Sequence, residues 1–492
     1  MALVPVTLPP GVLRNGTQEQ SKAHFYNTSL VRWGAGGLLT QMKGWVKRNV
    51  AQTALTGSAR ACTTWQDNSA ARWIGVATNS NLYVQSAAGT VFDITPASFV
   101  AGAADASVLT GYGTGNYGVG TFGTSRPDSG SIIPAAMWSL DLWNDKLVGV
   151  CASDGRLVQW NLATGTPAAV ITNAPTGQQA LLVTAEGFMM AFKNRTITWS
   201  DQADNTIWAP SDTNQARSFS LQTPGAIQCG AKITGAALIL TTADAWRANY
   251  VGYPIVYGFT RVGAGCGAVS RGALVAVDQV AFWLGREKFY KYNGSVTPLE
   301  CDIADLVFGD INLNQLTKVT SGHRAASGEV WWNYCSANST EINRQAIYNY
   351  RQNCWYPNAL ARTCMADAGP AFSNPTMVSP DGYIYAHESG FTYDGAIPSA
   401  ETGPLRLGNG ERRMEVQGII PDERHTGDTT LTLTPHDYPN SPDGTPVVLS
   451  NLTSPTDFLM QAGRLRLLYQ FVGSTPATVG DFMLNIIPGD PL

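Results

Sequence analysis

The stretch FWLGREKFYKYNGSV, residues 282–296, carries the signals that decide the fold. Its aromatic residues recur at nearly every second position, which is the period at which the side chains of a β-strand return to one face. Asn293 and Gly294 then form a dipeptide that favours a tight turn between strands. The stretch therefore predicts a β-hairpin unit with aromatic residues on both faces, and both faces need a covering neighbour.

Similar units recur along the chain, at steps of roughly 45 to 65 residues, close to the spacing of β-propeller blades. A single hairpin is marginally stable in water, whereas one stacked between two neighbours can bury aromatics on both faces. Trp331 and Trp332 are adjacent, so on a strand they point to opposite faces. The units lie at residues 72–96, 144–165, 187–210, 236–252, 278–299, 328–358 and 377–395.

These repeats predict an all-β protein with a six- or seven-bladed β-propeller, and a pair of β-sandwiches is the alternative. Aromatic residues with large buried areas would dominate the cores between blades. We expect the blade cores to contain Trp73, Trp160, Trp199, Trp208, Trp283, Trp331, Trp332 and Trp355.

The pattern changes at both ends of the repeats. Residues 396–492 alternate polar and apolar positions, which predicts an additional antiparallel, sandwich-like β domain that we call the platform. Residues 1–60 do not match the repeated unit, and we expect an N-terminal arm that packs on the platform. The propeller then spans residues 61–395, with an insertion rich in glycine and aromatic residues at about 98–131.

Charged residues are scarce in this chain of 492 residues. They make up 14 % of it, with a net charge of −4, against about 25 % in an average globular domain. Much of the surface must then be neutral, or buried against other subunits. Tight non-specific binding of nucleic acid is disfavoured, since it needs a surplus of Lys and Arg. The N-terminus lacks a signal-peptide pattern and no run of about 20 apolar residues occurs, so we expect no membrane insertion.

No motif of an active site or a metal site is found. The eight cysteines are dispersed without a CxxC pair, which predicts free thiols in small buried sites. Many aspartates are explained by turns, as at Asp154 and Asp381, each followed by glycine. His387 beside Glu388 could act as a base but has no partner motif. We expect no enzyme, cofactor or metal, and a propeller glycosidase with paired carboxylates remains the alternative.

The order of several motifs resembles a known family. The motifs FYNTSLVRWGAGGLLTQMKGWVKR, WIGVATNSNLYV, FDITP, GYGTGNYGVGTFGT, WSDQADNTIWAP, FWLGREKFYKYNGSV and EVWWNYCS follow one another. In this order they are similar to the tail nozzle (tail tubular protein B-like) proteins of short-tailed bacteriophages and prophages. The resemblance covers most of residues 25–395. It is weaker in the C-terminal part, which is similar mainly in its general type of sequence.

The resemblance implies a structural virion component with no catalytic residue to carry over. In the family, a propeller-containing chain assembles as a homohexameric ring below the portal and adaptor proteins. The ring extends and gates the channel for DNA ejection, and it offers docking surfaces for tail fibres and a needle or plug protein. This chain would be assembled in the bacterial host cytoplasm and would reside in the virion tail. Double-stranded DNA would pass through it without sequence-specific binding.

Two groups of residues are candidates for contact surfaces. Tyr112, Tyr117 and Phe122 in the insertion would line the lumen or touch a neighbouring subunit, unless the insertion is a mobile surface loop. Lys43, Lys47 and Arg48 would contact the part of the tail above, unless they form a solvated rim. The alternative function is a propeller module that binds or cleaves host surface glycans, as a receptor-binding protein or depolymerase.

Overall fold

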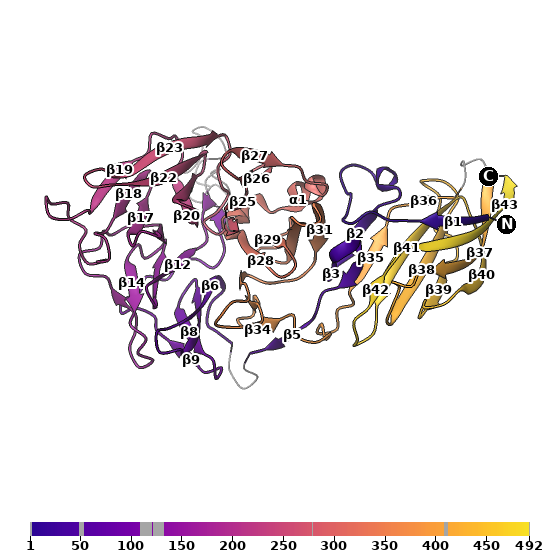
Figure 1. The fold of residues 1–492 in the computed structure, drawn as a ribbon, viewed down its shortest axis with the longest axis horizontal. Helices are drawn as coiled ribbons and strands as arrows, with labels where there is room; N and C mark the ends of the chain where they lie inside the picture. The colour runs from indigo at the N-terminus through magenta and orange to yellow at the C-terminus, as the bar shows by residue number, and fades with distance from the viewer. Residues whose placement is uncertain are drawn as a thin grey trace.

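The computed structural model describes residues 2–48, 54–108, 121, 132–277, 279–407 and 412–491. Figure 1 shows two bodies placed end to end: a wheel of small sheets and a layered β structure that carries both chain termini at its far end. The wheel is a β-propeller and the layered body is the platform. The predicted all-β fold, with a propeller and an additional sandwich-like domain, is confirmed.

The described residues form seven four-stranded antiparallel sheets in the wheel. The first contains β6 (Ala59–Gln66), β7 (Arg72–Thr78), β8 (Leu82–Ser86) and β9 (Val91–Asp93). The second contains β12 (Trp138–Trp143), β13 (Lys146–Cys151), β14 (Leu157–Trp160) and β15 (Ala169–Val170). The third contains β16 (Ala180–Val183), β17 (Met189–Lys193), β18 (Thr196–Trp199) and β19 (Arg217–Ser220). The fourth contains β20 (Ile227–Ile233), β21 (Ala236–Thr241), β22 (Asp244–Gly252) and β23 (Val256–Ala264).

The remaining three sheets continue around the wheel. The fifth contains β24 (Leu274–Val277), β25 (Val280–Leu284), β26 (Phe289–Tyr292) and β27 (Val296–Leu299). The sixth contains β28 (Thr320–Arg324), β29 (Glu329–Tyr334), β30 (Arg344–Asn349) and β31 (Cys354–Asn358). The seventh contains β32 (Cys364–Ala366), β33 (Thr376–Val378), β34 (Ile384–His387) and β5 (Trp45–Lys47). Residues 282–296 thus form the end of β25, all of β26 and the first residue of β27.

The wheel closes into a ring. Each innermost strand contacts the next one, in the order β6, β12, β16, β20, β24, β28 and β32, and β32 then contacts β6 again. The described sheets therefore make a seven-bladed propeller, the upper of the two predicted blade numbers. The last blade is completed by β5, whose Trp45 pairs with His387 of β34, so a strand from before the first blade fastens the last one.

The platform consists of three described sheets built from both ends of the chain. One contains β1 (Ala2–Val6), β43 (Phe482–Pro491), β37 (Arg412–Pro421) and β40 (Thr456–Ala462). A second contains β2 (Phe25–Ser29), β35 (Ser399–Thr402), β41 (Arg464–Phe471), β38 (Thr429–His436), β39 (Val447–Ser450) and β36 (Leu405–Arg406). The third contains β3 (Val31–Trp33), β4 (Leu39–Gln41) and β42 (Thr478–Val479). On β41, buried and half-buried residues alternate strictly, which is the period-2 pattern of a strand with one face on a core.

The segment expected to be one N-terminal arm is divided between the two bodies. Strands β1 to β4 pair within the platform, whereas β5 belongs to the propeller. The physical reason is the seventh blade, which contributes three strands of its own and gains its fourth from residues 45–47. The described remainder includes β10 (Ser107–Val108) paired with β11 (Ile132–Ile133), helix α1 (Ala304–Asp310) and the 3₁₀ turns η1 (Gln18–Ser21), η2 (Ala35–Gly37) and η3 (Leu313–Lys318).

All eight tryptophans expected in the blade cores are buried. The adjacent pair shows why both faces of a blade are covered. The indole nitrogen of Trp332 donates to the carbonyl oxygen of Ala273 near the fifth blade, at 3.1 Å, whereas that of Trp331 donates to Glu329, at 2.9 Å. Each buried tryptophan removes about 150–250 Å² of surface from water.

Candidate functional site

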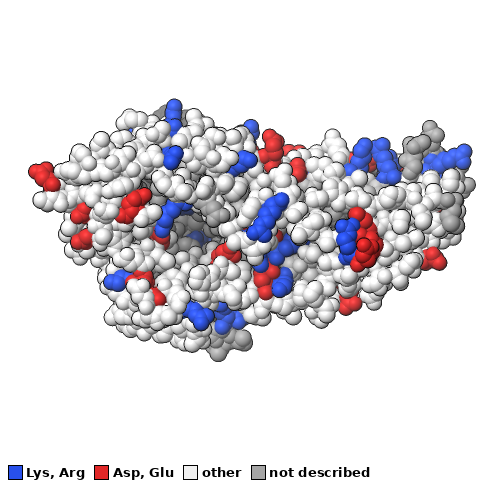
Figure 2. Space-filling view, viewed as in Figure 1, with Lys and Arg blue, Asp and Glu red and all other residues white. Residues whose placement is uncertain are grey.

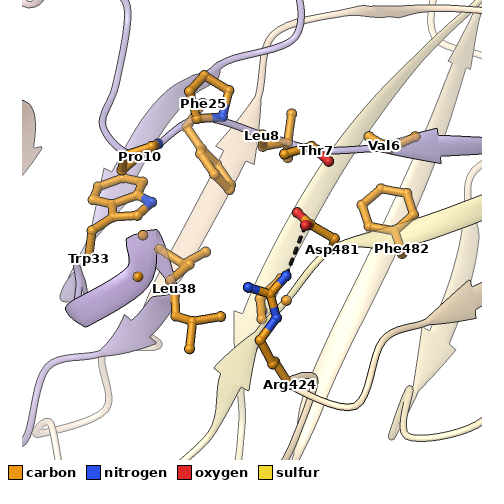
Figure 3. Close-up of a pocket in the computed structure, with 16 residues that line it drawn as sticks. Val6, Thr7, Leu8, Pro10, Phe25, Trp33, Leu38, Arg424, Asp481 and Phe482 are labelled. Carbon is orange, nitrogen blue, oxygen red and sulfur yellow. Dashed lines mark hydrogen bonds and ion pairs between the residues drawn. The ribbon is translucent and has the colours of Figure 1, made fainter. Parts of the chain in front are cut away.

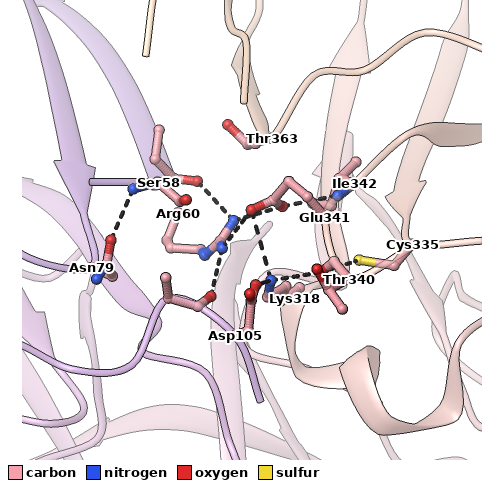
Figure 4. A network of polar contacts seen from close by, with 12 residues as sticks. Ser58, Arg60, Asn79, Asp105, Lys318, Cys335, Thr340, Glu341, Ile342 and Thr363 are labelled. Carbon is pink, nitrogen blue, oxygen red and sulfur yellow. Dashed lines mark hydrogen bonds and ion pairs between the residues drawn. The ribbon is translucent and has the colours of Figure 1, made fainter. Parts of the chain in front are cut away.

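A buried network of charges fastens the insertion to the propeller, and we call it the anchor network: Arg60, Asp105, Lys318 and Glu341 (Figure 4). Arg60 on innermost strand β6 donates two hydrogen bonds to the Glu341 carboxylate, at 2.9 and 2.8 Å. Lys318, at the end of η3, pairs with Asp105 and lies 3.7 Å from Glu341. The side chains of Arg60 and Lys318 are 0 % exposed.

The anchor network joins blades that are not neighbours in the ring. Arg60 belongs to the first blade, while Glu341 lies between β29 and β30 of the sixth. Figure 2 shows the face of the wheel hollowed near its centre, with charged side chains at the edge of the hollow and others scattered over the wheel and the platform. The network thus holds the segment after β9 across the inner part of the wheel.

The start of the insertion is held by its backbone as well. Arg60 donates to the carbonyl oxygen of Ala104, at 2.7 Å. The buried amide of Gln315 accepts from the backbone N–H of Ala106, at 2.9 Å, and donates to its carbonyl oxygen, at 2.8 Å. Strand β10 follows directly on this anchored segment and pairs with β11. The insertion therefore leaves from and returns to one fixed place on the propeller. Tyr112, Tyr117 and Phe122 lie outside the described residues.

The Glu341 carboxylate of the anchor network is ionised although it is largely buried. Burial acts to raise the pKa of Glu341, but the hydrogen bonds and charge of Arg60, with the charge of Lys318, outweigh it and hold that pKa below its usual value of 4.5. The carboxylate is therefore ionised at neutral pH and faces two buried cations. No motif marked these residues in the sequence, because Arg60 and Glu341 are 281 positions apart.

A second charged cluster couples the platform to the propeller. Arg32 on β3 contacts Glu329 of the sixth blade, at 2.9 Å, and Glu388 after the seventh, at 2.8 Å. The fully buried Glu329 also accepts from the Tyr356 hydroxyl, at 2.7 Å. Arg324 pairs with Glu388 as well. One side chain from the N-terminal segment thereby ties two blades to the platform strands.

His387 and Glu388, considered as a candidate base, are engaged in structure. The ring nitrogen Nε2 of His387 accepts a hydrogen bond from Arg362 Nε, at 2.9 Å. Burial, with the charges of Arg362, Arg324 and Arg48, holds the pKa of His387 well below its usual value of 6.5. The imidazole is neutral, and the atom that would take a proton is already occupied. Glu388 is held in its ion pairs with arginine. This arrangement does not suit a general base.

The three basic residues of the predicted contact surface, Lys43, Lys47 and Arg48, differ in their exposure and in their side-chain contacts. Lys43 is exposed. Lys47 places its ammonium nitrogen 3.5 Å from the centre of the Tyr383 ring. Arg48 donates to Thr376 Oγ1, at 2.7 Å, and its guanidinium lies over Phe372. Lys47 and Arg48 therefore contribute to the seventh blade, and the contact of this group with another tail protein stays a prediction.

A small pocket lies where the N-terminal segment crosses the platform (Figure 3). Its volume is about 170 Å³, and its walls include Pro10, Phe25, Trp33 and Leu38. Arg424 and Asp481 form an ion pair at its edge, with 2.9 Å between nitrogen and oxygen. Sites for small molecules usually enclose about 300–1,000 Å³ with several converging polar groups. The pocket is better described as a packing gap between two segments.

Two further properties of the described ranges concern metal ligation and membrane crossing. There, no group of three or more His, Cys, Asp and Glu side chains is placed to hold a metal ion. The described helices include none that is long and apolar enough to cross a membrane.

Comparisons with known proteins show similarity at the level of fold. No protein-family model and no curated protein matches the chain. Among solved structures, virginiamycin B lyase from Staphylococcus aureus is 9 % identical, with a TM-score of 0.41, over 68 % of this chain and 97 % of that one. The Pan2 WD40 domain of Neurospora crassa is 8 % identical, with a TM-score of 0.39, over 72 % and 97 %. An exo-β-1,3-galactanase from Phanerochaete chrysosporium is 8 % identical, with a TM-score of 0.30, over 91 % and 100 %.

Proposed function

We propose that this chain is a structural subunit of the tail nozzle of a short-tailed bacteriophage. Six copies would form a ring below the portal and adaptor proteins, and this ring would extend and gate the channel for DNA ejection. The proposal rests first on the ordered motifs over residues 25–395 that resemble this family. The observation in the structure that supports it best is the firm coupling of a propeller to a platform through Arg32, which suits a load-bearing part.

The distribution of charge also supports an assembled, non-enzymatic role. Charged side chains make up 14 % of the chain, and the face in Figure 2 is mostly uncharged. Depletion of charge is a feature of the central parts of protein interfaces. A mildly acidic chain also favours a lumen along which DNA slides, because phosphates would adhere to a basic wall.

The partners follow from the same proposal. They are further copies of the chain, the portal-adaptor proteins above, and tail fibres with a needle or plug protein below. The chain would be part of the virion tail after assembly in the host cytoplasm. Its ordinary state would include no cofactor. The engagement of His387 by Arg362 supports the absence of catalysis at that position.

Antibody labelling of intact particles tests the proposal. Gold-labelled antibody against the platform should mark the tail axis of every particle, at its distal part. Label on peripheral fibres, or particles without label, would contradict a nozzle. A parallel assay of polysaccharide binding and cleavage by the purified chain separates the alternatives: binding alone would support a receptor-binding module, and release of sugar would support a depolymerase.

A further inference from the structure

Two thiols meet at the place where the propeller ring closes. Cys62 lies on β6, the innermost strand of the first blade, and Cys364 begins β32, the innermost strand of the seventh. These two strands contact one another and complete the ring. We call this contact the closure seam. The two cysteines are 302 positions apart in the sequence, so only the closure of the ring brings them together.

The side chains of both cysteines point into the seam. Cys62 and Cys364 pack in one apolar cluster, which also contains Ile74 and Val76 of the first blade and Val378 of the seventh. The residues adjacent in sequence pack elsewhere: Ala61 belongs with the cluster between the first and second blades, and Met365 with another core. This alternation is the one expected for side chains on a strand.

The two thiols are direct neighbours. Cys62 and Cys364 pack in the same cluster across the contact between β6 and β32, and the presence of Cys364 raises the pKa of the Cys62 thiol. Cys364 is buried, whereas Cys62 is partly exposed. We therefore expect a dissolved reagent to react first with Cys62, the more exposed residue of the two, and Cys364 to supply the second sulfur.

Opposing influences set the pKa of the Cys62 thiol. The neighbouring Cys364 and burial raise the pKa of the Cys62 thiol, while the charge of Arg48 acts in the opposite direction. Arg48 is itself fixed by its hydrogen bonds to Asn374 and Thr376 of the seventh blade. Cations near a cysteine stabilise the thiolate, which is the reactive form. The raised pKa means that the reaction should be slow.

We propose that Cys62 and Cys364 form a disulfide that closes the propeller covalently when the protein meets an oxidised low-molecular-weight thiol such as glutathione disulfide. Cys62 loses its proton, and its thiolate attacks one sulfur of the reagent, which breaks the reagent's S–S bond and releases one glutathione. Cys364 then loses its proton and attacks the Cys62 sulfur of the mixed disulfide, which releases the second glutathione. Two protein thiols are oxidised, and one glutathione disulfide is reduced to two thiols.

The bond would strengthen the seam, which is otherwise held by packing and by β5. A disulfide that spans a long stretch of chain restricts the unfolded state strongly. Opening of the ring between its first and last blades would then require reduction. The inference concerns closure of the wheel and does not rest on the proposed function, so either can fail without the other.

Peptide mapping of the natural protein tests this directly. The purified chain is incubated with glutathione disulfide, its free thiols are alkylated, and it is digested with trypsin. Cys62 lies in the tryptic peptide of residues 61–72 and Cys364 in that of residues 363–406, each with a single cysteine. We expect a linked pair of these peptides and the loss of two of the eight alkylatable thiols. The thermal midpoint of the propeller should rise by about 5 °C or more and return after reduction.

Serine variants supply the controls. Cys62→Ser and Cys364→Ser should each abolish the linked peptide and the rise in midpoint. Cys229→Ser is the matched control, because Cys229 also lies on an innermost strand but its sulfur contacts the carbonyl oxygen of Ser270; it should leave both effects intact. Retention of all eight thiols, or glutathione attached to Cys62 without the linked pair, would overturn the proposal.

Discussion

Replacement of Glu341 by glutamine removes the carboxylate that two buried cations share. Arg60 and Lys318 are fully buried, while the Glu341 side chain is 23 % exposed. Loss of one partner from a buried ion pair costs about 3–5 kcal/mol, and we take the lower end, about 3 kcal/mol, because carbonyl oxygens and Asp105 still accept from the two cations. For a body as large as the propeller this lowers the thermal midpoint by on the order of 5 °C.

The assay is thermal unfolding of Glu341→Gln beside the natural chain, followed by the intrinsic fluorescence of the buried tryptophans. The matched control is Asp105→Asn, because the Asp105 side chain is 50 % exposed. It should cost about 1 kcal/mol or less. If Glu341→Gln unfolds at the natural midpoint, or if both variants lose the same amount, the network does not stabilise the propeller in the way described.

The difference in thermal stability between Glu341→Gln and the natural chain should depend on pH. The pKa of Glu341 is lower in the folded state than its usual value of 4.5. Stability from this group is thus present above that value and is lost as the pH falls through the folded pKa. The difference in midpoint between Glu341→Gln and the natural chain should shrink in acid, and a constant difference down to unfolding would contradict the assignment.

Three further predictions concern other parts of the chain. The pKa of His387 is lowered in the folded protein, so the stability of the folded state should fall as the pH drops below 6.5. His387→Gln should make stability depend less steeply on pH in this range, as measured by unfolding at several pH values. An unchanged dependence would count against a buried neutral histidine. Trp45→Ala removes a buried ring stacked on His387, with centroids 5.2 Å apart. The loss should lower the free energy of unfolding by about 3–5 kcal/mol and speed tryptic cleavage after Lys47. Unaltered cleavage would show that β5 stays paired with the seventh blade without this ring. Replacing Tyr112, Tyr117 and Phe122 together by Ala should weaken ring assembly in native mass measurements while the monomer's midpoint stays the same, and normal rings would show that these residues are dispensable.

The propeller was predictable from sequence because its signals are local. Alternating aromatics and a turn dipeptide in residues 282–296 specify one hairpin, and repetition of such hairpins specifies the stacking. The adjacent Trp331 and Trp332 already required cover on both faces, and both are buried. The sequence predicts six or seven blades and does not decide between them, because the repeated units differ in length and their number is not well defined.

The features that the sequence could not reveal depend on contacts between residues far apart in the chain. Strand β5 has three residues, too few to carry a period, and it joins the seventh blade because that blade lacks a fourth strand of its own. The anchor network and the cluster around Arg32 unite single charged residues from separate strands and loops, and in the sequence each of them resembles an ordinary surface charge. Cys62 and Cys364 appear dispersed in sequence and meet only after the ring has closed.

Symmetry-resolved imaging of tail particles tests the central claim most directly. The region that binds antibody against this chain is reconstructed without imposed symmetry, and its copies are counted around the tail axis. Six copies in a closed ring around a continuous channel, each with a seven-bladed wheel attached to a platform, is the predicted result. Three copies on a fibre, a different ring number, or no position on the axis would contradict the proposal that this chain forms the nozzle.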